Sequence, residues 1–259
     1  MIKLQFLGTG GLGSARIRNK LSREYRRFST LLIDERIIID PSEDIFEFEE
    51  SFMLSGMLRE IREAFITHSH LDHFSVSAIE RLASLTSKRL RVFAEEALRE
   101  DIESISGLEF VPISPLSLIR LEGYNVLPLP ANHSTDLPSE VALNFLIEKE
   151  GKTLLYGIDG AFINPEAWRV LNELHLDAVI LDCALADAPY SAESVNHNNL
   201  AMAATVKEIM TARGTADEGT KFILSHIPTN KKRLMHDELT EAAKEFSFKV
   251  AYDGYFIGI

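Results

Sequence analysis

The chain has 259 residues, of which 46% are hydrophobic and one is a cysteine, and its formal net charge at pH 7 is −12. This length suits one large domain with a sizeable core, and a single cysteine excludes both a disulfide framework and a cysteine zinc cluster. The acidic balance excludes a protein whose whole surface binds nucleic acid, and no run of residues is long and apolar enough to span a membrane.

Short apolar runs in the first half of the chain predict β-strands, because such runs bounded by turn residues are typical of strands. The expected strands cover residues 2–8, two runs within 29–41 on either side of a turn at Glu35-Arg36, and residues 64–68, 90–94, 108–113 and 124–131. Residues 75–87 instead predict an amphipathic helix, because Val76, Ile79 and Leu82 recur at helical spacing.

The second half of the chain alternates strands with helices. Strands are expected in a hairpin over 141–159 that turns at 149–152, in the almost wholly apolar run 177–183, and in 221–227 and 247–259. Helices are expected over 165–175, over 198–214 with Asn198 or Asn199 as N-cap and Gly214 beyond its end, and over 232–246. Two sheets packed face to face with helices outside satisfy this α/β (α+β) pattern in a single domain, residues 1–259, although periodicity alone allows other α/β arrangements.

The segment THSHLDHF, residues 67–74, places three histidines and an aspartate within six positions, directly after an expected strand. Imidazole and carboxylate ligands together suit zinc, manganese or iron, and the scarcity of cysteine removes the thiolate alternative. The segment therefore predicts a metal site.

Four further polar residues also follow apolar strands, which is where α/β folds tend to place ligands. They are Asp40, His133, Asp159 and His226. Taken singly, such a residue is more often a cap or turn residue, but these four repeat the setting of the histidine cluster. Three histidines could hold one ion, and Asp72, His73 and His226 could hold a second with Asp159 as a bridge. Two ions about 3.5–4 Å apart can clamp the oxygens of an in-line displacement.

The segments THSHLDH, NHS, GIDG and LSHI match, in order and rough spacing, the ligand motifs of the metallo-β-lactamase superfamily. The resemblance covers essentially the whole chain and implies a four-layer αββα sandwich of two mixed sheets, with two divalent ions (zinc or manganese, or else iron) between the sheet edges. The ligands that it implies for the first metal are His68, His70 and His133. Those that it implies for the second are Asp72, His73 and His226, with Asp159 bridging. Asp40 resembles the aspartate that orients a ligating histidine.

Other segments indicate a branch of this superfamily. FLGTGGLGSARIRN, residues 6–19, resembles the phosphodiesterase branch that includes the tRNA 3′-processing endonucleases. EYRRFSTLLID, DCALADAP, NHNNL and VAYDG are more similar to the cyclic phosphodiesterase of the phosphonate-degradation (carbon–phosphorus lyase) pathway. In that branch the histidine corresponding to His197 protonates the leaving oxygen, and the resemblance implies this role for His197. The alternative is that His197 only caps a helix. We expect Asp72 to orient or accept the proton of the attacking water.

Basic residues gather between Arg16 and Arg27 and again over 231–233. Such runs are often only solvated faces, but beside a metal site they would favour an anionic substrate, which we expect Arg16, Arg18 and Asn19 to contact. Glycines in the first loop permit close backbone approach to an anion, or form only a tight turn. They are Gly8, Gly10, Gly11 and Gly13.

These features together predict a metal-dependent hydrolase of a small cyclic phosphate or nucleotide-like diester, and the acidic balance argues against a long nucleic acid. The alternatives are hydrolysis of a lactone, thioester or other ester on the same metals, a tRNA 3′-processing-like nuclease, and a non-catalytic binding protein that has kept the fold. The first residues lack a signal-peptide layout, so we expect a cytoplasmic protein without a membrane partner. The resemblance also allows a homodimer.

Overall fold

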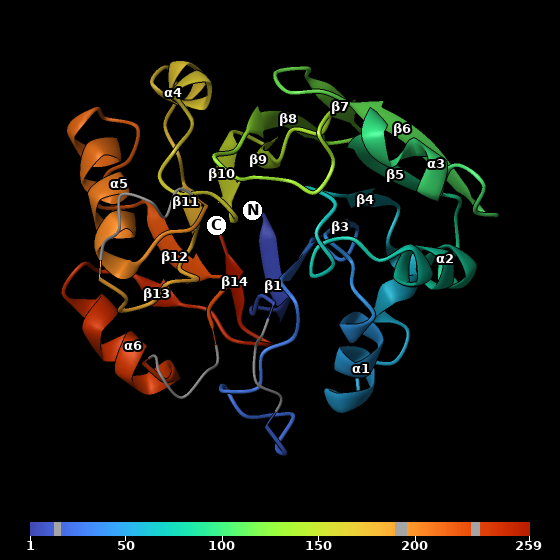
Figure 1. Cartoon of the computed structure of the whole chain (residues 1–259), viewed down its shortest axis with the longest axis horizontal. Coiled ribbons are helices and arrows are strands. Elements are labelled where there is room, and N and C mark those ends of the chain that lie inside the picture. Colours follow the sequence, from blue (N-terminus) through green and yellow to red (C-terminus); the bar gives the residue numbers. More distant parts are fainter. Residues whose placement is uncertain (13–16, 190–195, 229–233) are drawn as a thin grey trace.

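The computed structural model describes residues 1–12, 17–189, 196–228 and 234–259, and within these ranges the chain forms two seven-stranded mixed β-sheets with helices outside them (Figure 1). The first sheet has the order β14 (Phe256–Gly258), β1 (Lys3–Gly8), β2 (Thr30–Ile33), β3 (Ile37–Ile39), β4 (Glu63–Phe65), β5 (Leu90–Glu95) and β6 (Leu108–Ile113). The second has the order β13 (Lys249–Val250), β12 (Lys221–Ser225), β11 (Ala178–Asp182), β10 (Lys152–Gly157), β9 (Leu143–Lys149), β8 (Tyr124–Pro130) and β7 (Ile119–Leu121).

Helices cover the outer face of each sheet. Those packed on the first sheet are α1 (Asp44–Ser51), α2 (Val76–Leu85) and α3 (Arg99–Ile102), together with the 3₁₀ turns Met57–Glu60 and Glu96–Leu98. Those on the second sheet are α4 (Pro165–Leu171), α5 (Leu200–Ala212) and α6 (His236–Lys244). This is the expected αββα sandwich. No helix among the described residues has the length and apolar character needed to cross a membrane.

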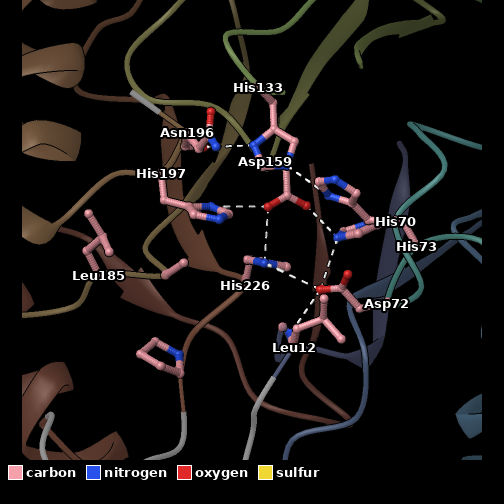
Figure 2. A pocket seen from close by; sticks show the side chains of 13 residues that line it. Leu12, His70, Asp72, His73, His133, Asp159, Leu185, Asn196, His197 and His226 are labelled. Carbon is pink, nitrogen blue, oxygen red and sulfur yellow. Dashed lines mark hydrogen bonds and ion pairs between the residues drawn. The ribbon is translucent and has the colours of Figure 1, made fainter. Parts of the chain in front are cut away.

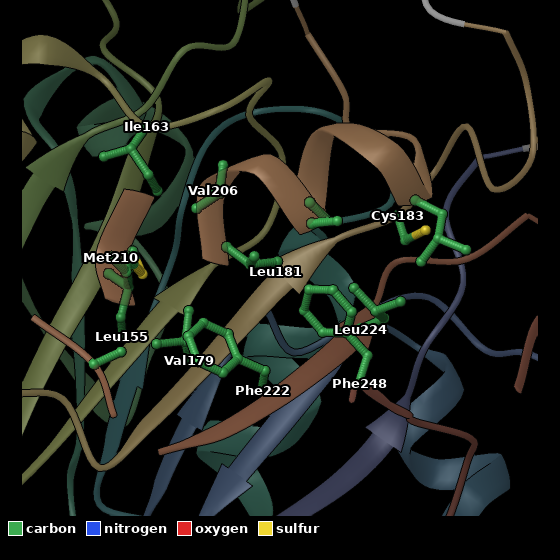
Figure 3. Packing of buried hydrophobic residues seen from close by; sticks show 14 of the residues in the cluster. Leu155, Ile163, Val179, Leu181, Cys183, Val206, Met210, Phe222, Leu224 and Phe248 are labelled. Atoms are coloured by element: carbon green, nitrogen blue, oxygen red, sulfur yellow. The ribbon is translucent and has the colours of Figure 1, made fainter. Parts of the chain in front are cut away.

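Three apolar layers hold the sandwich together. Between the sheets, the ring of Phe65 stacks on Phe93 at a centroid distance of 4.5 Å and meets the edge of Phe145 from the opposite sheet at 5.3 Å. Behind the second sheet, Leu181 and Leu224 pack under α5, as Figure 3 shows. Each large side chain buried in this way contributes about 1.5–3 kcal/mol, so the layers fix the strand ends from which the loops emerge.

Most expected elements are present, with shifted ends. The turn between β2 and β3 lies one residue earlier than expected, because Asp34 and Glu35 both have positive φ and Arg36 N donates to Ile33 O at 3.0 Å. Asn199 is the N-cap of α5, since its side chain accepts a hydrogen bond from the Met202 N–H.

The predicted ends of two helices were wrong. Helix α4 ends at Leu171 rather than at 175, because the chain leaves it to enter β11 and Leu176 N donates to Thr215 O. Helix α6 begins at His236 rather than at 232, and Glu238 marks its start by accepting the Met235 N–H at 2.9 Å. Helices α1 and α3 and strand β7 were not expected.

Two adjacent arginines of the basic run are core residues. Arg26 donates to Thr9 Oγ1 and to Ala251 O, both at 2.8 Å, and its side chain is almost fully buried. Arg27 pairs with the buried Asp253 at 3.1 Å, and Thr9 donates to the same carboxylate at 2.8 Å. Because buried charges require such partners, these two arginines anchor the loop after β1 from behind and are not part of a solvated face.

The pH dependence of stability should report on this network. The His236 Nδ1 atom lies 3.0 Å from Arg26 Nη2, and burial together with the charges of Arg26 and Arg23 lowers the pKa of His236 to about 4. At a pH above 6.5, the ordinary pKa of histidine, His236 is neutral in both the folded and the unfolded chain, and its full contribution to stability is present. As the pH falls from there through about 4, the unfolded chain takes up a proton more readily than the folded one, so this contribution to the free energy of unfolding is lost.

We therefore expect the wild type to lose stability relative to a His236→Gln variant as the pH is lowered from 7 to 4. Glutamine keeps an acceptor for Arg26 and does not titrate. Asp253, whose pKa burial raises to about 6, is present in both proteins, so its opposite pH dependence cancels in the difference. Urea unfolding at several pH values measures this difference, and a constant value over that range would contradict the expectation.

Candidate metal centre

The seven residues expected as metal ligands converge at one end of the sandwich, and all of them except His68 line a cavity of about 430 Å³ (Figure 2). His68, His70, Asp72 and His73 lie on the loop after β4, His133 follows β8, Asp159 follows β10 and His226 follows β12. Strand β4 ends at Phe65, earlier than expected, so the histidine cluster lies on the loop and not in the sheet.

The first group of facing ring nitrogens consists of three histidines. His70 Nδ1 lies 2.9 Å from His68 Nε2 and 3.2 Å from His133 Nε2. The other ring nitrogens are held from behind, His68 Nδ1 by the Thr67 hydroxyl and His133 Nδ1 by the Asn196 carbonyl, each at 3.0 Å. These outer contacts fix the ring orientations, so the three remaining nitrogens face one point.

The second group combines carboxylates with imidazoles. Asp159 Oδ2 lies 2.5 Å from His73 Nε2, and Asp159 Oδ1 lies 3.1 Å from His226 Nε2. Asp72 Oδ2 lies 3.5 Å from the same His73 nitrogen and 3.8 Å from that of His226. Asp159 also belongs with His68 and His73 to a further set whose ligand atoms could hold one ion, which places its carboxylate between the two groups.

The buried Asp40 supports this second group. Its carboxylate accepts hydrogen bonds from the backbone N–H and the hydroxyl of Thr67, and it accepts the N–H of His73 Nδ1, each at 2.8 Å. One carboxylate thus fixes the start of the histidine loop and the orientation of His73. Ser29 has a corresponding position behind His226, with Oγ 3.0 Å from Nδ1.

Three buried carboxylates surround one imidazole. Burial alone would lower the pKa of His73, but the charge of Asp159, the close approach of the Asp159 and Asp72 carboxylates and the hydrogen bond to Asp40 raise it well above its ordinary value. Burial would raise the pKa of Asp159, but the charges of His226 and His73 hold it well below its usual range. The centre thus carries concentrated negative charge, which favours a cation.

The donor set fits a metal ion. Among the buried polar atoms that the structure describes, His73 Nε2 and both carboxylate oxygens of Asp159 have no hydrogen-bond partner, although they lie close together. Leaving such atoms unsatisfied is costly, and a shared cation would satisfy all three. Imidazole and carboxylate without thiolate suit zinc, manganese or iron, and the buried Cys183 is not in any of the four candidate ligand sets.

His197 lies at the cavity beside these groups, held by a residue that the sequence analysis missed. Its Nδ1 is 2.7 Å from Oδ2 of Asp182, which is fully buried at the end of β11, and 3.3 Å from Asp159 Oδ1. Burial lowers the pKa of His197, but the charge of Asp182, the hydrogen bond to Asp182 and the nearby Asp159 carboxylate outweigh it and raise the pKa to about 10. Asp182 follows an apolar strand like the other candidates, so the same rule could have found it.

The residues expected to contact substrate lie elsewhere or outside the described ranges. Arg16, Gly13 and the basic trio 231–233 are outside them. Arg18 and Asn19 are exposed and do not line the cavity, and the Asn19 side chain accepts the Leu21 N–H at 3.1 Å. No lysine or arginine is found among the described residues that line the cavity, whose apolar wall includes Leu12 and Leu185.

The glycine loop packs directly against the metal ligands. A Cβ atom on Gly11 would lie 2.5 Å from His226 Nε2, and one on Gly8 would lie 1.9 Å from Phe28 O. Leu12 N donates to Asp72 Oδ2 at 2.9 Å. The described part of this loop therefore approaches two candidate ligands, Asp72 and His226, and Phe28 in the segment before β2.

A Gly11→Ala variant is expected to bind the second ion about 10–100-fold more weakly, the usual cost of misorienting a ligand. The added methyl group would force the His226 imidazole out of its position. Calorimetric titration of metal-free protein with Zn²⁺ measures the effect. Gly219→Ala is a suitable control, because its nearest contact is the flexible Asp217 side chain, and unchanged binding of both ions by Gly11→Ala would contradict the expectation.

Comparison with known proteins gives a match to the beta-lactamase superfamily domain over residues 35–227. No curated protein matches the chain by sequence. Among solved structures, the metallo-beta-lactamase fold protein YhfI from Bacillus subtilis is similar with a TM-score of 0.73 and 16% identity, over 99% of this chain and 98% of that one. Human tRNase Z, short form, has a TM-score of 0.68 and 20% identity, over 99% of both chains. Zn²⁺-bound PqqB from Methylobacterium extorquens has a TM-score of 0.73 and 14% identity, over 99% of this chain and 100% of that one.

Proposed function

Since the chain belongs to the beta-lactamase superfamily and has the metallo-β-lactamase fold of metal-dependent hydrolases, we propose that it hydrolyses a phosphodiester, either a small cyclic phosphate or a nucleotide-like diester. The observation that carries this proposal is the His197–Asp182 pair beside the two ligand groups. A phosphodiester with an alkoxide leaving group needs a proton donor, and a histidine held by a buried carboxylate suits that task.

Two divalent ions would be held by the residues described above. His68, His70 and His133 would hold the first, Asp72, His73 and His226 the second, and Asp159 would bridge them. Bound there, such ions would supply Lewis acidity and bring the pKa of water close to neutrality.

Two side chains of the protein, Asp72 and His197, would carry out the proton transfers. Asp72 would accept or orient the proton of the attacking water. Its pKa, held far below its usual range by His73 and His226 despite burial, keeps it ionised, which suits a group that orients the water by accepting a hydrogen bond. His197 would deliver a proton from Nε2 to the leaving oxygen, while Asp182 holds Nδ1 and orients the ring. Asp40 would keep His73 in place throughout.

A small substrate fits both the cavity and the charge of the protein. The cavity of about 430 Å³ is within the usual range for small-molecule sites. A net charge of −12 opposes the long polyanion that a tRNA 3′-processing-like nuclease would bind. Contacts from Arg16, Arg18 and Asn19 to the substrate remain part of the proposal.

The test is hydrolysis of bis(p-nitrophenyl) phosphate by purified protein, after chelation and after restoration with Mn²⁺ or Zn²⁺. We expect turnover that is lost on chelation and restored by metal. A panel of cyclic phosphates would then identify the substrate class, and comparison of the two metals under matched conditions would identify the one that supports turnover better. Protein that binds two ions and leaves every diester intact would overturn the proposal.

Hydrolysis of a lactone or thioester is the second candidate. It is favoured by the apolar wall at Leu12 and Leu185 and by the lack of a lysine or arginine among the cavity-lining residues that the structure describes. An uncharged ester needs no cation beyond the metals. Lactone turnover without diester turnover in the same assay would select this candidate.

A further inference from the structure

The backbone of Asp159 adopts a conformation that its side chain disfavours. Its φ is +52°, in the left-handed region that glycine enters freely and that aspartate enters more readily than most residues, but still at a cost. Phe162, three residues later in the same loop, has a φ of +58°. Strain of this kind persists only where surrounding contacts over-determine the conformation, so other residues must hold this loop.

Two asparagine side chains supply those contacts, one on each side of Asp159. Asn144 Nδ2, from β9, donates to Ile158 O at 2.8 Å, and Asn198 Nδ2, from the turn before α5, donates to Gly160 O at 2.9 Å. The Asn198 Oδ1 atom also accepts the Phe162 N–H at 2.8 Å. Asn198 is fully buried and Asn144 nearly so, which makes these hydrogen bonds costly to lose.

We propose that Asn144 and Asn198 are positioning residues that hold the Asp159 carboxylate between the two ligand groups, so that two ions can be bound together. The inference rests on the metal-binding part of the proposed function and not on the substrate. The two hydrogen bonds fix the carbonyl groups of Ile158 and Gly160, on either side of Asp159. Because the backbone is held at both points, the direction of the Asp159 side chain is fixed as well.

Asn198 also connects this loop to the proton donor. It follows His197 in the chain and precedes Asn199, whose side chain caps α5 by accepting the Met202 N–H at 2.8 Å. Asn196, on the other side of His197, accepts the His133 N–H through its carbonyl. The segment 196–199, held at the N-terminus of α5, thus contacts His133, contains His197 and fixes the loop of Asp159.

The experiment is calorimetric titration of the metal-free full chain with Mn²⁺, for the wild type and for Asn198→Ala, Asn198→Asp and Asn144→Ala. We expect the wild type to bind two ions, and each variant to keep the first affinity and bind the second ion about 10–100-fold more weakly. Asn198→Asp keeps the acceptor for Phe162 N, but it replaces the donor to Gly160 O by a carboxylate oxygen that repels this carbonyl. Asn125→Ala, which removes an amide bonded to Glu148 on a distant part of β8 and β9, is the matched control.

Two further measurements separate positioning from a general loss of stability. In an Asp159→Ala background, Asn198→Ala should cause no additional loss of second-ion affinity, because its effect passes through the missing carboxylate. The electron paramagnetic resonance spectrum of the Mn²⁺-loaded wild type should show a coupled pair, and that of Asn198→Asp should show isolated ions.

The proposal is overturned if the variants bind both ions like the wild type, if the loss is equal with and without Asp159, or if the wild type binds one ion only. If Asn198→Ala fails to fold, Asn144→Ala and Asn198→Asp decide the question. A wild type that binds two ions and hydrolyses no diester would contradict the proposed function and leave this inference standing.

Discussion

An Asp72→Asn variant is expected to lose turnover by about 10²–10⁴-fold, the usual scale for a proton-transfer group. The amide has the shape of the carboxylate and can still accept the Leu12 N–H, so the loop should keep its conformation. It lacks the negative charge that faces His73 and His226 and cannot take a proton from water. The expected loss of turnover therefore has two causes, weaker binding of the second ion and the absence of a proton acceptor.

Metal stoichiometry and kcat, measured on the same preparation, separate these two contributions. With saturating metal, the remaining loss in kcat belongs to proton transfer. Asp101→Asn is the control, because this exposed carboxylate of α3 neither lines the cavity nor belongs to a candidate ligand set. Equal kcat for Asp72→Asn and the wild type would remove Asp72 from the mechanism.

The convergence of the candidate ligands could be predicted because their signal is local. THSHLDH carries four candidate ligands in one short segment, and Asp159 and His226 follow apolar runs that are unmistakably strands. In this fold the ends of such strands meet at one edge, so position after a strand is enough to bring the side chains together. Asp182 obeys the same rule and is the first residue of DCALADAP, but that segment was used only to indicate the branch and no role was assigned to its aspartate.

The supporting residues could not be predicted in this way, because their partners are distant in the sequence and follow no period. Asn198 binds a carbonyl 38 positions away, and Arg27 pairs with a carboxylate 226 positions away. The left-handed backbone at Asp40, Asp159 and His226 also has no sequence signature, since none of the three is glycine. These strained positions coincide with the candidate metal centre, where local preference gives way to the geometry of the site.

Helix α1 illustrates a different failure. Phe46 and Phe48 are two positions apart, as in a strand, and the sequence analysis assigned no element to the segment around them. In the structure both rings are buried against the first sheet, and Phe48 stacks on Phe52 at a centroid distance of 4.3 Å. Tertiary packing thus selects a helix where the short pattern is ambiguous.

A His197→Ala variant is expected to keep both metal ions and to lose about 10²–10⁴-fold in kcat for a diester with an alkyl leaving group. Alanine removes the imidazole that Asp182 orients. His197 shares a candidate set with His133 and Asp159, but it is not among the ligands that the resemblance implies for either ion. The same variant should lose much less activity toward bis(p-nitrophenyl) phosphate, because p-nitrophenolate leaves without protonation.

This dependence on the leaving group is what distinguishes a proton donor from a residue that only shapes the cavity. Loss of shape would slow both substrates alike, whereas loss of the donor slows only the substrate whose leaving oxygen needs a proton. His175→Ala is the control, since that histidine is half-exposed and pairs with Asp217 at 3.1 Å. Equal losses for the two leaving groups would assign His197 to the wall of the cavity, and proton donation would then have to come from water.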